Sequence, residues 1–457
     1  MKHTSAPLAA PPAPDGTYYR ARRERLLQTI HKTHGGGLVL MPTAPEMFRN
    51  RDSLYPYRPE SYFYYLSGFP EPDAVLALSC DSFGETRHVL FCREKDIERE
   101  TWNGFRFGPD AAREIFAFDD AFPISSLAEH WPMLAMNQPA LFTPFGLYSS
   151  WDHAITQRLG ALRAYARGGV APPACVVDVR DLLDPMRMRK DEHEIALMRY
   201  AAAVSAQAHI RAMRFARPGH FEYQVEAELQ HEFLTHGAQA AYLSIVASGE
   251  NACVLHYVEN RRRIDAGDLL LIDAGCEYQN YAADITRTFP VGRRFSAAQK
   301  DVYELVLAAQ RACFDALKPG APLHAFHDAA ERVLAQGMID LKLIEGPLDA
   351  ALETDSFKRF YMHRAGHWLG LDVHDAGHYQ RGENGEAPTL LKPGMALTVE
   401  PGCYICAAED VPAAFHNIGV RIEDDVLIAQ DGIDILTAAV PKSVVEVEAL
   451  CAEADKR

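Results

Sequence analysis

Two strand-like apolar segments of this chain end on a carboxylate, and a glycine follows each carboxylate within two residues. Leu269–Ile272 leads into Asp273, and Ala396–Val399 leads into Glu400. Short apolar runs bounded by such breaks predict buried strands. A polar group at the end of a buried strand is presented to a cavity that the scaffold shapes. The two segments therefore predict a fold whose strands present an acidic site.

Length and composition place these strands in a large globular chain. A chain of 457 residues is longer than a single hydrophobic core usually supports, so at least two domains are expected. A hydrophobic content of 48% and a charged content of 24% are ordinary for a soluble enzyme. The formal net charge of -16 argues against a nucleic-acid partner, because such a partner requires a basic surface.

Cysteine usage and apolar runs bear on the cellular compartment. The nine cysteines have no repeating spacing, which indicates reduced thiols in the cytoplasm and not a disulfide framework. No apolar run approaches the roughly 20 residues that span a bilayer, so no membrane partner is expected. The Ala/Pro-rich start lacks an apolar core, so residues 1–16 are expected to be a disordered tail and not a secretory signal.

A turn-rich passage divides the rest of the chain. Residues 171–185 hold Pro172-Pro173 and Asp184-Pro185, and we expect the inter-domain connection there, between domains at 17–180 and 181–457. Alternating helices and strands make the first domain α/β, with a helix at 20–32 and strands at 38–41, 62–66, 74–78 and 89–92. The second domain is predicted to be α+β, with helices at 191–215, 222–235, 297–317 and 323–336 among its strands.

Three further residues complete the acidic site. Asp284 lies on a strand predicted at 281–289, His367 lies in a histidine-rich segment, and Glu423 lies on a strand predicted at 420–426. With Asp273 and Glu400 they offer four carboxylates and one imidazole, a hard set that suits a pair of divalent cations such as manganese. Two such ions can share and deprotonate one water and stabilise a hydrolytic transition state. The set predicts a metallohydrolase.

Each of these residues also has an ordinary structural explanation. An isolated aspartate is commonly a turn or cap residue, a single histidine is commonly structural, and an alternating charged strand can simply face solvent. The neighbours favour a site. Thr286 shares a predicted strand face with Asp284 and would orient its carboxylate, and Arg421 would keep a ligating carboxylate two residues away ionised. Four histidines also lie within sixteen residues between glycines: His363, His367, His374 and His378.

Signatures of other hydrolases are missing from the sequence. The pair His231 and His236 resembles a zinc-protease box, but the two are five residues apart and fall about 140° apart around a helix. There is no GxSxG nucleophile turn and no GxxxxGK[ST] phosphate loop. Serine-hydrolase and nucleotide-hydrolase chemistry therefore lack support.

The flanks of the five residues resemble the pita-bread M24 metallopeptidases, and most closely the Xaa-Pro aminopeptidases (aminopeptidase P). The segments that carry the resemblance in the second half are 272–275, 281–289, 363–375, 399–402 and 421–425, together with 248–251 and 256–257. In the first half, 50–53 and 57–68 resemble the amino-terminal domain of bacterial aminopeptidase P. The resemblance runs from about residue 18 to the end of the chain.

This resemblance implies a role for each matching residue. Asp273 and Asp284 would bind one metal ion, His367 and Glu400 the other, and Asp284 and Glu423 would bridge the two. A bridging hydroxide would attack the carbonyl before proline, and Glu400 would shuttle the proton to the leaving nitrogen. His256 and His374 would hold the substrate carbonyl and its oxyanion. Further roles fall to His363 as a pocket residue, Arg421 as a support for the ligands, Tyr404 as a cap on the pocket, and Trp102 as an aromatic donated across a subunit interface.

The expected activity is manganese-dependent release of the first residue from peptides with proline second. Because an X–Pro bond has no amide hydrogen and a fixed φ, general peptidases cleave it poorly. Two alternatives stay open. A prolidase would share the fold and metals but cleave only X–Pro dipeptides, and a pita-bread binding protein would have lost hydrolysis. The resemblance also implies a homo-oligomer, either a dimer or a tetramer.

Overall fold

The computed structural model describes residues 8–381 and 387–453. The described chain forms two compact units: residues 12–186 make up the first, and residues from 187 onward, with those before residue 12, make up the second. Leu8 packs against a core of the second unit. Residues 1–7 of the predicted tail lie outside the described residues. None of the helices in the described part of the chain combines the length and apolar character that a bilayer crossing requires.

The first unit is built on a six-stranded mixed sheet in the order β6-β5-β4-β1-β7-β8. Its strands are β1 (Gly37–Pro42), β4 (Val75–Cys80), β5 (Thr86–Cys92), β6 (Asp120–Pro123), β7 (Ala140–Thr143) and β8 (Cys175–Asp178). A small hairpin, β2 (Phe48–Asn50) and β3 (Ser53–Leu54), stands apart. The helices are α1 (Gly16–His34), α2 (Ser61–Ser67), α3 (Ile97–Asn103), α4 (Gly108–Ile115), α5 (Leu127–Ala135), α6 (Ser149–Arg163) and α7 (Arg180–Arg187).

Helix α2 corrects one prediction. Aromatic residues make 62–66 look like a strand, but the segment is helical because both of its ends are capped. The Glu60 carboxylate accepts the backbone N–H of Phe63, and Gly68 ends the helix in a left-handed conformation with φ +64°. Phe63 and Tyr65 are buried, so packing of the helix adds to its caps.

The passage predicted as the connection holds regular structure, and the two compact units divide just beyond it, between residues 186 and 187. Residues 175–178 form β8, which continues the sheet in parallel with β7, and α7 follows within the same passage. Pro185 lies inside α7 and did not prevent helix formation. Pro172 and Pro173 precede the short edge strand, and Pro185 is part of the short helix.

The second unit combines long helices with short sheets. Its helices are α8 (Glu192–Phe215), α9 (Glu222–Thr235), α10 (Ala297–Ala316), α11 (Ala325–Asp340), α12 (Leu348–Glu353) and α13 (Val444–Ala452), with a 3-10 helix η3 (Gly249–Cys253). Its strands include β10 (Ile245–Ser248), β11 (Leu269–Asp273), β13 (Tyr281–Ala282), β14 (Thr286–Pro290), β17 (Ala396–Val399), β18 (Gly402–Ile405), β19 (Ile418–Arg421), β20 (Asp424–Ala429) and β21 (Gly432–Ile435). The short strands β9 (Gln239–Ala240), β12 (Cys276–Tyr278), β15 (Gln380–Arg381) and β16 (Ala387–Pro388) complete the described set.

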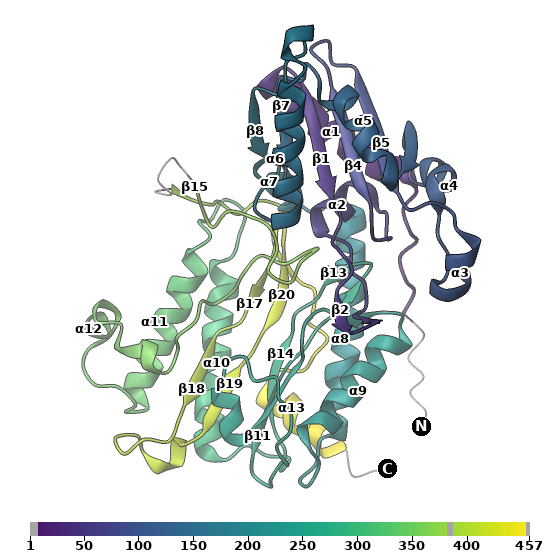
Figure 1. The fold of residues 1–457 in the computed structure, drawn as a ribbon. Coiled ribbons are helices and arrows are strands. Elements are labelled where there is room, and N and C mark those ends of the chain that lie inside the picture. The colour runs from purple at the N-terminus through teal and green to yellow at the C-terminus, as the bar shows by residue number, and fades with distance from the viewer. Residues whose placement is uncertain (1–7, 382–386, 454–457) are drawn as a thin grey trace. The chain divides into compact units, whose positions relative to one another are not determined.

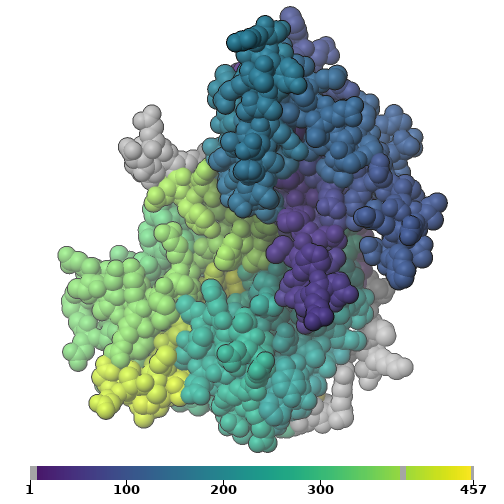
Figure 2. All heavy atoms as spheres, viewed as in Figure 1, coloured from purple at the N-terminus to yellow at the C-terminus, as the bar shows by residue number. Residues whose placement is uncertain are grey.

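Figure 1 shows α8 and α9 on one flank of the strands of this unit and α10 and α11 on the other. Antiparallel pairing joins β10, β11 and β14 into one sheet and β17, β20 and β21 into another. Figure 2 shows segments far apart in sequence, near residues 260 and 410, side by side on the surface. This arrangement confirms the prediction of an α/β amino-terminal domain that is followed along the chain by an α+β pita-bread unit.

The predicted helices of the second unit are confirmed, and their first residues show why they begin where they do. Asp191 caps α8 and Ser296 caps α10, each through a reciprocal capping box with the residue three positions later. The apolar stripe of α8 packs into a core with β11 and β14, where Val204 and Ile272 are fully buried. The helices therefore fix the strands that end at the site.

Candidate metal centre

Asp273 and Asp284 lie together at the edge of one sheet. Asp273 is the last residue of β11, and Asp284 lies between β13 and β14. Gly275 permits this approach, because a Cβ atom there would lie 1.7 Å from the carbonyl oxygen of Ala283. The hydroxyl of Tyr242 lies 2.7 Å from Asp273 Oδ1 and 2.5 Å from Asp284 Oδ1, so one phenol bridges both carboxylates.

The imidazole of His367 is oriented as a ligand. Residues 367–369 run beside β17, where the His367 N–H bonds Thr398 Oγ1 at 3.0 Å and the His367 carbonyl accepts the Thr398 N–H. Nδ1 lies 3.0 Å from the Trp368 carbonyl oxygen and donates its proton there, so Nε2 is the nitrogen that points toward the carboxylates. Nε2 faces Asp284 Oδ2 at 3.4 Å and Glu400 Oε1 at 3.7 Å.

Glu423 occupies a break between two strands. The strand predicted at 420–426 is interrupted, because β19 ends at Arg421 and β20 begins at Asp424. The N–H of Glu423 bonds the Thr286 carbonyl at 3.0 Å, and the Thr286 hydroxyl donates to Glu423 Oε2 at 2.6 Å. Thr286 therefore orients Glu423 and not Asp284, which corrects the predicted pairing. The strand predicted at 281–289 is broken too, at the residues around Asp284.

Glu400 follows the last residue of β17, as predicted from the apolar run before it. Its N–H bonds the Ala365 carbonyl at 2.8 Å, which ties it to the segment that carries His367. Gly366 makes this approach possible, because a Cβ there would lie 2.0 Å from the Thr398 carbonyl oxygen. Burial raises the pKa of Glu400 to about 7, against the opposing charges of His367 and Arg421.

The donor set fits divalent metal ions. Ligand atoms of Asp284, His367 and Glu423 all lie within 4.8 Å of one another. Burial, reinforced by the neighbouring carboxylates, raises the pKa of Glu423 well above its usual value, and burial likewise raises the pKa of Asp273. Crowded buried carboxylates are costly unless cations offset them, and oxygen-rich sites with one imidazole suit ions such as Mn²⁺. These residues can hold two divalent ions.

A hydrogen-bond chain leads from Asp273 to His363. Arg421 donates from Nη2 to Asp273 Oδ2 at 2.6 Å, from Nε to Thr286 Oγ1 at 3.1 Å and from Nη1 to the Tyr404 hydroxyl at 2.9 Å. The Tyr404 hydroxyl lies 2.8 Å from His363 Nε2. His363 Nδ1 lies 2.8 Å from the Arg364 carbonyl and donates to it, so Nε2 accepts the Tyr404 proton. Burial lowers the pKa of His363 to about 4, which keeps its ring neutral.

The remaining predicted residues lie at the solvent side or in the other unit. The ring of His374 meets that of His367 edge-on, with centroids 4.2 Å apart. His256 follows η3, is exposed, and is close enough for its charge to lower the pKa of His374, after burial and His367. Trp102 lies on α3 of the first unit and is 82% exposed. The functional roles of all predicted site residues stay predictions.

Three neighbours of the ligands were missed from the sequence. Tyr242 lies in a loop before β10 and carries no local signal, because its contacts are with residues 31 and 42 positions away. Thr398 reads as an ordinary strand residue, yet it holds His367. Asp425 lies on β20, and its carboxylate accepts the Asp284 N–H at 3.1 and 3.2 Å. Arg421 contacts Asp273 and not Glu423, as the broken strand allows.

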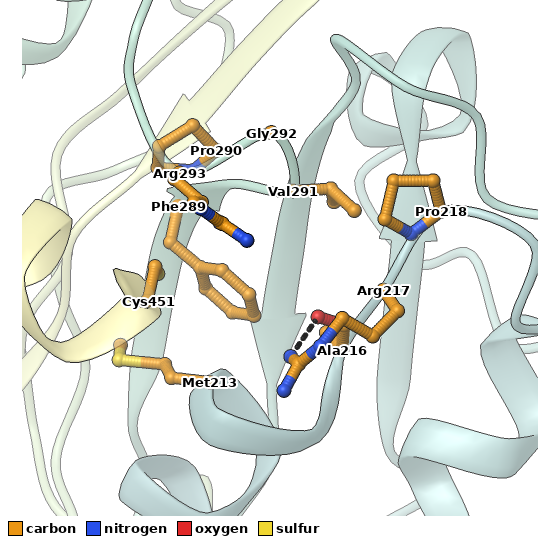
Figure 3. A pocket seen from close by; sticks show the side chains of 10 residues that line it. All are labelled: Met213, Ala216, Arg217, Pro218, Phe289, Pro290, Val291, Gly292, Arg293 and Cys451. Carbon is orange, nitrogen blue, oxygen red and sulfur yellow. Dashed lines mark hydrogen bonds between the residues drawn. The ribbon is translucent and has the colours of Figure 1, made fainter. Parts of the chain in front are cut away.

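A separate cavity of about 390 Å³ lies where the end of α8 meets the end of β14 (Figure 3). Its lining is apolar apart from two guanidinium groups, those of Arg217 and Arg293, and includes Met213, Phe289 and Cys451. Arg217 donates to the carbonyl of Ala216 at 2.7 Å, the bond drawn in Figure 3. None of the residues lining this cavity is a carboxylate, so the acidic set does not belong to it.

Comparison with known proteins identifies the family. A model of metallopeptidase family M24 matches residues 196–430, and a model of the aminopeptidase P N-terminal domain matches residues 19–142. The chain belongs to metallopeptidase family M24. The M24 match contains all five of the predicted metal ligands, and the resemblance drawn from the sequence is confirmed.

Full-length relatives place the chain within the family. The Xaa-Pro aminopeptidase of Escherichia coli strain K12 is 40% identical over 440 residues, which span 96% of this chain and 98% of that protein. The solved structure of Pseudomonas aeruginosa aminopeptidase PepP is 47% identical, covers 98% of this chain and 100% of its own, and superposes with a TM-score of 0.93. Human Xaa-Pro dipeptidase is 31% identical over 477 residues, 96% of this chain and 94% of that protein. This member of M24 is a metallo-exopeptidase of the Xaa-Pro aminopeptidase type.

Proposed function

We infer that the chain releases the amino-terminal residue from peptides with proline in the second position. The observation that carries this inference is the buried acidic site within a chain that matches an Xaa-Pro aminopeptidase along nearly its whole length. An X–Pro bond lacks an amide hydrogen and has a fixed φ, so its cleavage calls for a dedicated site. An acidic site also attracts the ammonium group at the start of a peptide, which favours removal of single residues.

We propose that the site holds two divalent ions through Asp273, Asp284, His367, Glu400 and Glu423. The geometry that supports this set is the cluster of Asp284, His367 and Glu423 and the Nε2 of His367 facing Glu400. Manganese is the proposed metal, because four carboxylates and one imidazole make a hard donor set. When bound, the pair supplies an activated water near neutral pH and stabilises charge that develops in the transition state.

The residues around the ions divide the remaining work. Glu400, which its backbone N–H ties to the segment that carries His367, carries a proton to the leaving proline nitrogen. His374 and His256 line the solvent side, where they hold the substrate carbonyl and its oxyanion. Arg421 fixes Asp273 and Tyr404 together, and Tyr404 fixes the ring of His363. His363 and Tyr404 then form a wall of the pocket for the proline side of the substrate.

The deciding experiment strips the protein with a chelator and assays it on Gly-Pro-X tripeptides and on X–Pro dipeptides, with and without added Mn²⁺. We expect tripeptide cleavage that returns with manganese. Absence of cleavage of both substrates would defeat the enzyme assignment and favour a binding protein. A comparison of Mn²⁺, Zn²⁺ and Co²⁺ at matched occupancy identifies the metal that gives the highest turnover.

Prolidase is the second candidate, and the human dipeptidase match is the observation that keeps it in view. Cleavage of dipeptides alone in the same assay would establish it. The greater identity to an aminopeptidase, 40% against 31%, favours the tripeptide outcome.

We also propose a cytoplasmic homo-oligomer, a dimer or tetramer, in which Trp102 serves a neighbouring subunit. The support is the 82% exposure of this indole and the free state of all nine cysteines. Light scattering of the purified protein gives the subunit number. A Trp102→Ala variant that keeps the oligomer but raises KM would support the shared-site role, and an unchanged KM would exclude it.

A further inference from the structure

A charged cluster, fully buried except for one partly exposed lysine, lies behind the two proposed glutamate ligands. Its centre is the carboxylate of Asp424, the residue after Glu423. Arg287 Nη2 lies 2.7 Å from Asp424 Oδ1, and Lys442 Nζ lies 2.6 Å from Asp424 Oδ2. Gln310 from α10 adds a bond of 3.0 Å to Oδ2. A buried carboxylate with this many donors is fixed in position, because each donor restricts it from a different element.

Arg287 connects this cluster to the break that presents Glu423. Its Nη1 donates to the backbone carbonyl of Glu423 itself and, at 3.0 Å, to the carbonyl of Thr286. Thr286 is the residue whose hydroxyl binds the Glu423 carboxylate. One guanidinium group therefore holds both the backbone of the ligand and the backbone of its side-chain partner.

Gln310 makes the corresponding connection to Glu400. Besides Asp424, its amide nitrogen lies 3.2 Å from the carbonyl oxygen of Val399 and 3.2 Å from that of Ile422. Val399 directly precedes Glu400, and Ile422 directly precedes Glu423. The amide oxygen of Gln310 is buried without a hydrogen-bond partner, so the side chain is oriented by what its nitrogen binds. A single amide thus joins the strand ends that carry both glutamates.

We propose that Arg287, Asp424 and Gln310 are positioning residues that set the spacing between Glu400 and Glu423 and thereby the affinity for the metal pair. This inference rests on the proposed ligand set. A purely structural role would predict something different: loss of a buried bond would lower the stability of the metal-free protein and leave metal affinity alone. Outer-shell contacts of metal ligands characteristically change affinity about 10- to 100-fold when removed.

The test compares Gln310→Leu with wild-type protein, both as full-length apoprotein. Leucine keeps most of the volume and removes the amide. Mn²⁺ is the probe, its dissociation constants are measured by competition with a fluorescent chelator, and the melting temperature of the apoprotein is recorded in parallel. Ser67→Ala is the matched control, because Ser67 is fully buried in the first unit and its hydroxyl donates to the Phe63 carbonyl at 2.7 Å. It loses a buried bond without touching a ligand.

We expect Gln310→Leu to bind Mn²⁺ at least about 10-fold more weakly, with turnover restored at saturating metal, and Ser67→Ala to bind like wild type. Arg287→Lys should weaken binding further, because a lysine can keep the Asp424 ion pair but not the carbonyl contacts. Wild-type affinity in Gln310→Leu would overturn the proposal, whether or not Arg287→Lys folds. If the wild-type protein itself does not take up two Mn²⁺ ions, the proposed set of metal ligands is wrong. That result differs from wild-type affinity in Gln310→Leu, which would overturn only the positioning role.

Discussion

Arg421 Nη2 lies 2.6 Å from Asp273 Oδ2, and the same guanidinium group contacts Thr286 and Tyr404 through its other two nitrogens. One side chain therefore links the proposed ligand Asp273, the threonine that orients Glu423 and the tyrosine that contacts His363. The planar guanidinium group of Arg421 donates hydrogen bonds in three fixed directions, and the ammonium group of a lysine cannot reproduce this geometry.

Arg421→Lys should lower kcat/KM about 10- to 100-fold even though charge is kept. Steady-state kinetics on Gly-Pro-X with saturating Mn²⁺ measures the effect. Arg359→Lys, at an exposed ion pair with Asp410, is the control and should change little. Activity within about threefold of wild type for Arg421→Lys would show that charge alone suffices there.

Tyr404→Phe should reduce turnover about 10-fold, because His363 Nε2 then loses the donor that fixes its ring. Tyr361→Phe is a close match as a control. Tyr361 is equally buried and packs edge-on against His363, but its hydroxyl has no hydrogen-bond partner among the described residues. Equal losses in the two variants would mean that bulk packing, and not the hydroxyl, matters at His363.

Glu400→Gln should retain bound metal but lose turnover, because an amide can neither accept nor deliver the proton assigned to this carboxylate. Metal content by elemental analysis and single-turnover cleavage of a tripeptide separate the two effects. Turnover that persists at the wild-type rate would remove the shuttle role from Glu400.

Metal removal should lower stability as well as activity. Burial raises the pKa values of Glu423 and Asp273, and bound cations would offset these carboxylates in the folded state. At a metal concentration of 100 times Kd, each site adds about 2.7 kcal/mol to the free energy of unfolding. A melting scan of chelated protein against protein with Mn²⁺ detects this, and identical midpoints would argue against a metal pair in the core.

Acid should destabilise the fold partly through His209. This buried imidazole lies with Nε2 2.8 Å from the Ala274 carbonyl, and burial lowers its pKa to about 4. Because the pKa is about 6.5 in the unfolded chain, the unfolded state takes up the proton first, and stability falls as the pH drops from about 6.5 toward 4. For this group the loss between pH 7.5 and 5.5 is about 1 kcal/mol.

Urea unfolding of wild type and His209→Gln at both pH values measures that loss. The variant should be less stable at pH 7.5 but show a smaller drop on acidification. An equal drop in both proteins would mean that His209 does not carry this part of the acid response.

The sequence indicated which residues gather at the candidate site better than it indicated the contacts among them. Asp273 and Glu400 could be recognised as candidate site residues because a continuous apolar run, typical of a buried strand, ends at each of them. A glycine follows each within two residues. Asp284 and Glu423 were assigned to continuous strands, yet each lies at a break, because the breaks are stabilised by partners such as Thr286 and Asp425 that are distant in sequence. Tyr242 could not be found at all, since its role depends only on tertiary proximity.

In the first unit, too, local sequence patterns did not predict structure that depends on tertiary contacts. Residues 62–66 carry strong β propensity, but a carboxylate cap at Glu60 and a left-handed Gly68 made them helical. The prolines of residues 171–185 suggested a linker, although an edge strand begins just after two of them and a helix contains the third. Local sequence preferences did not decide the structure of these two segments. Burial of aromatic side chains stabilised the helix at 62–66, and pairing with β7 stabilised the strand at 175–178.

Gly275 and Gly366 contribute no functional group, yet each lets two ligand-bearing segments touch, with backbone oxygens within 1.7 and 2.0 Å of where a Cβ would be. Neither glycine has a positive φ, so backbone conformation would not exclude alanine at either position. In a saturation mutagenesis screen scored for growth on proline-containing peptides, both positions should be as intolerant of substitution as the acidic residues themselves. The mutational footprint of the active site will thus include two residues that no chemical mechanism would name.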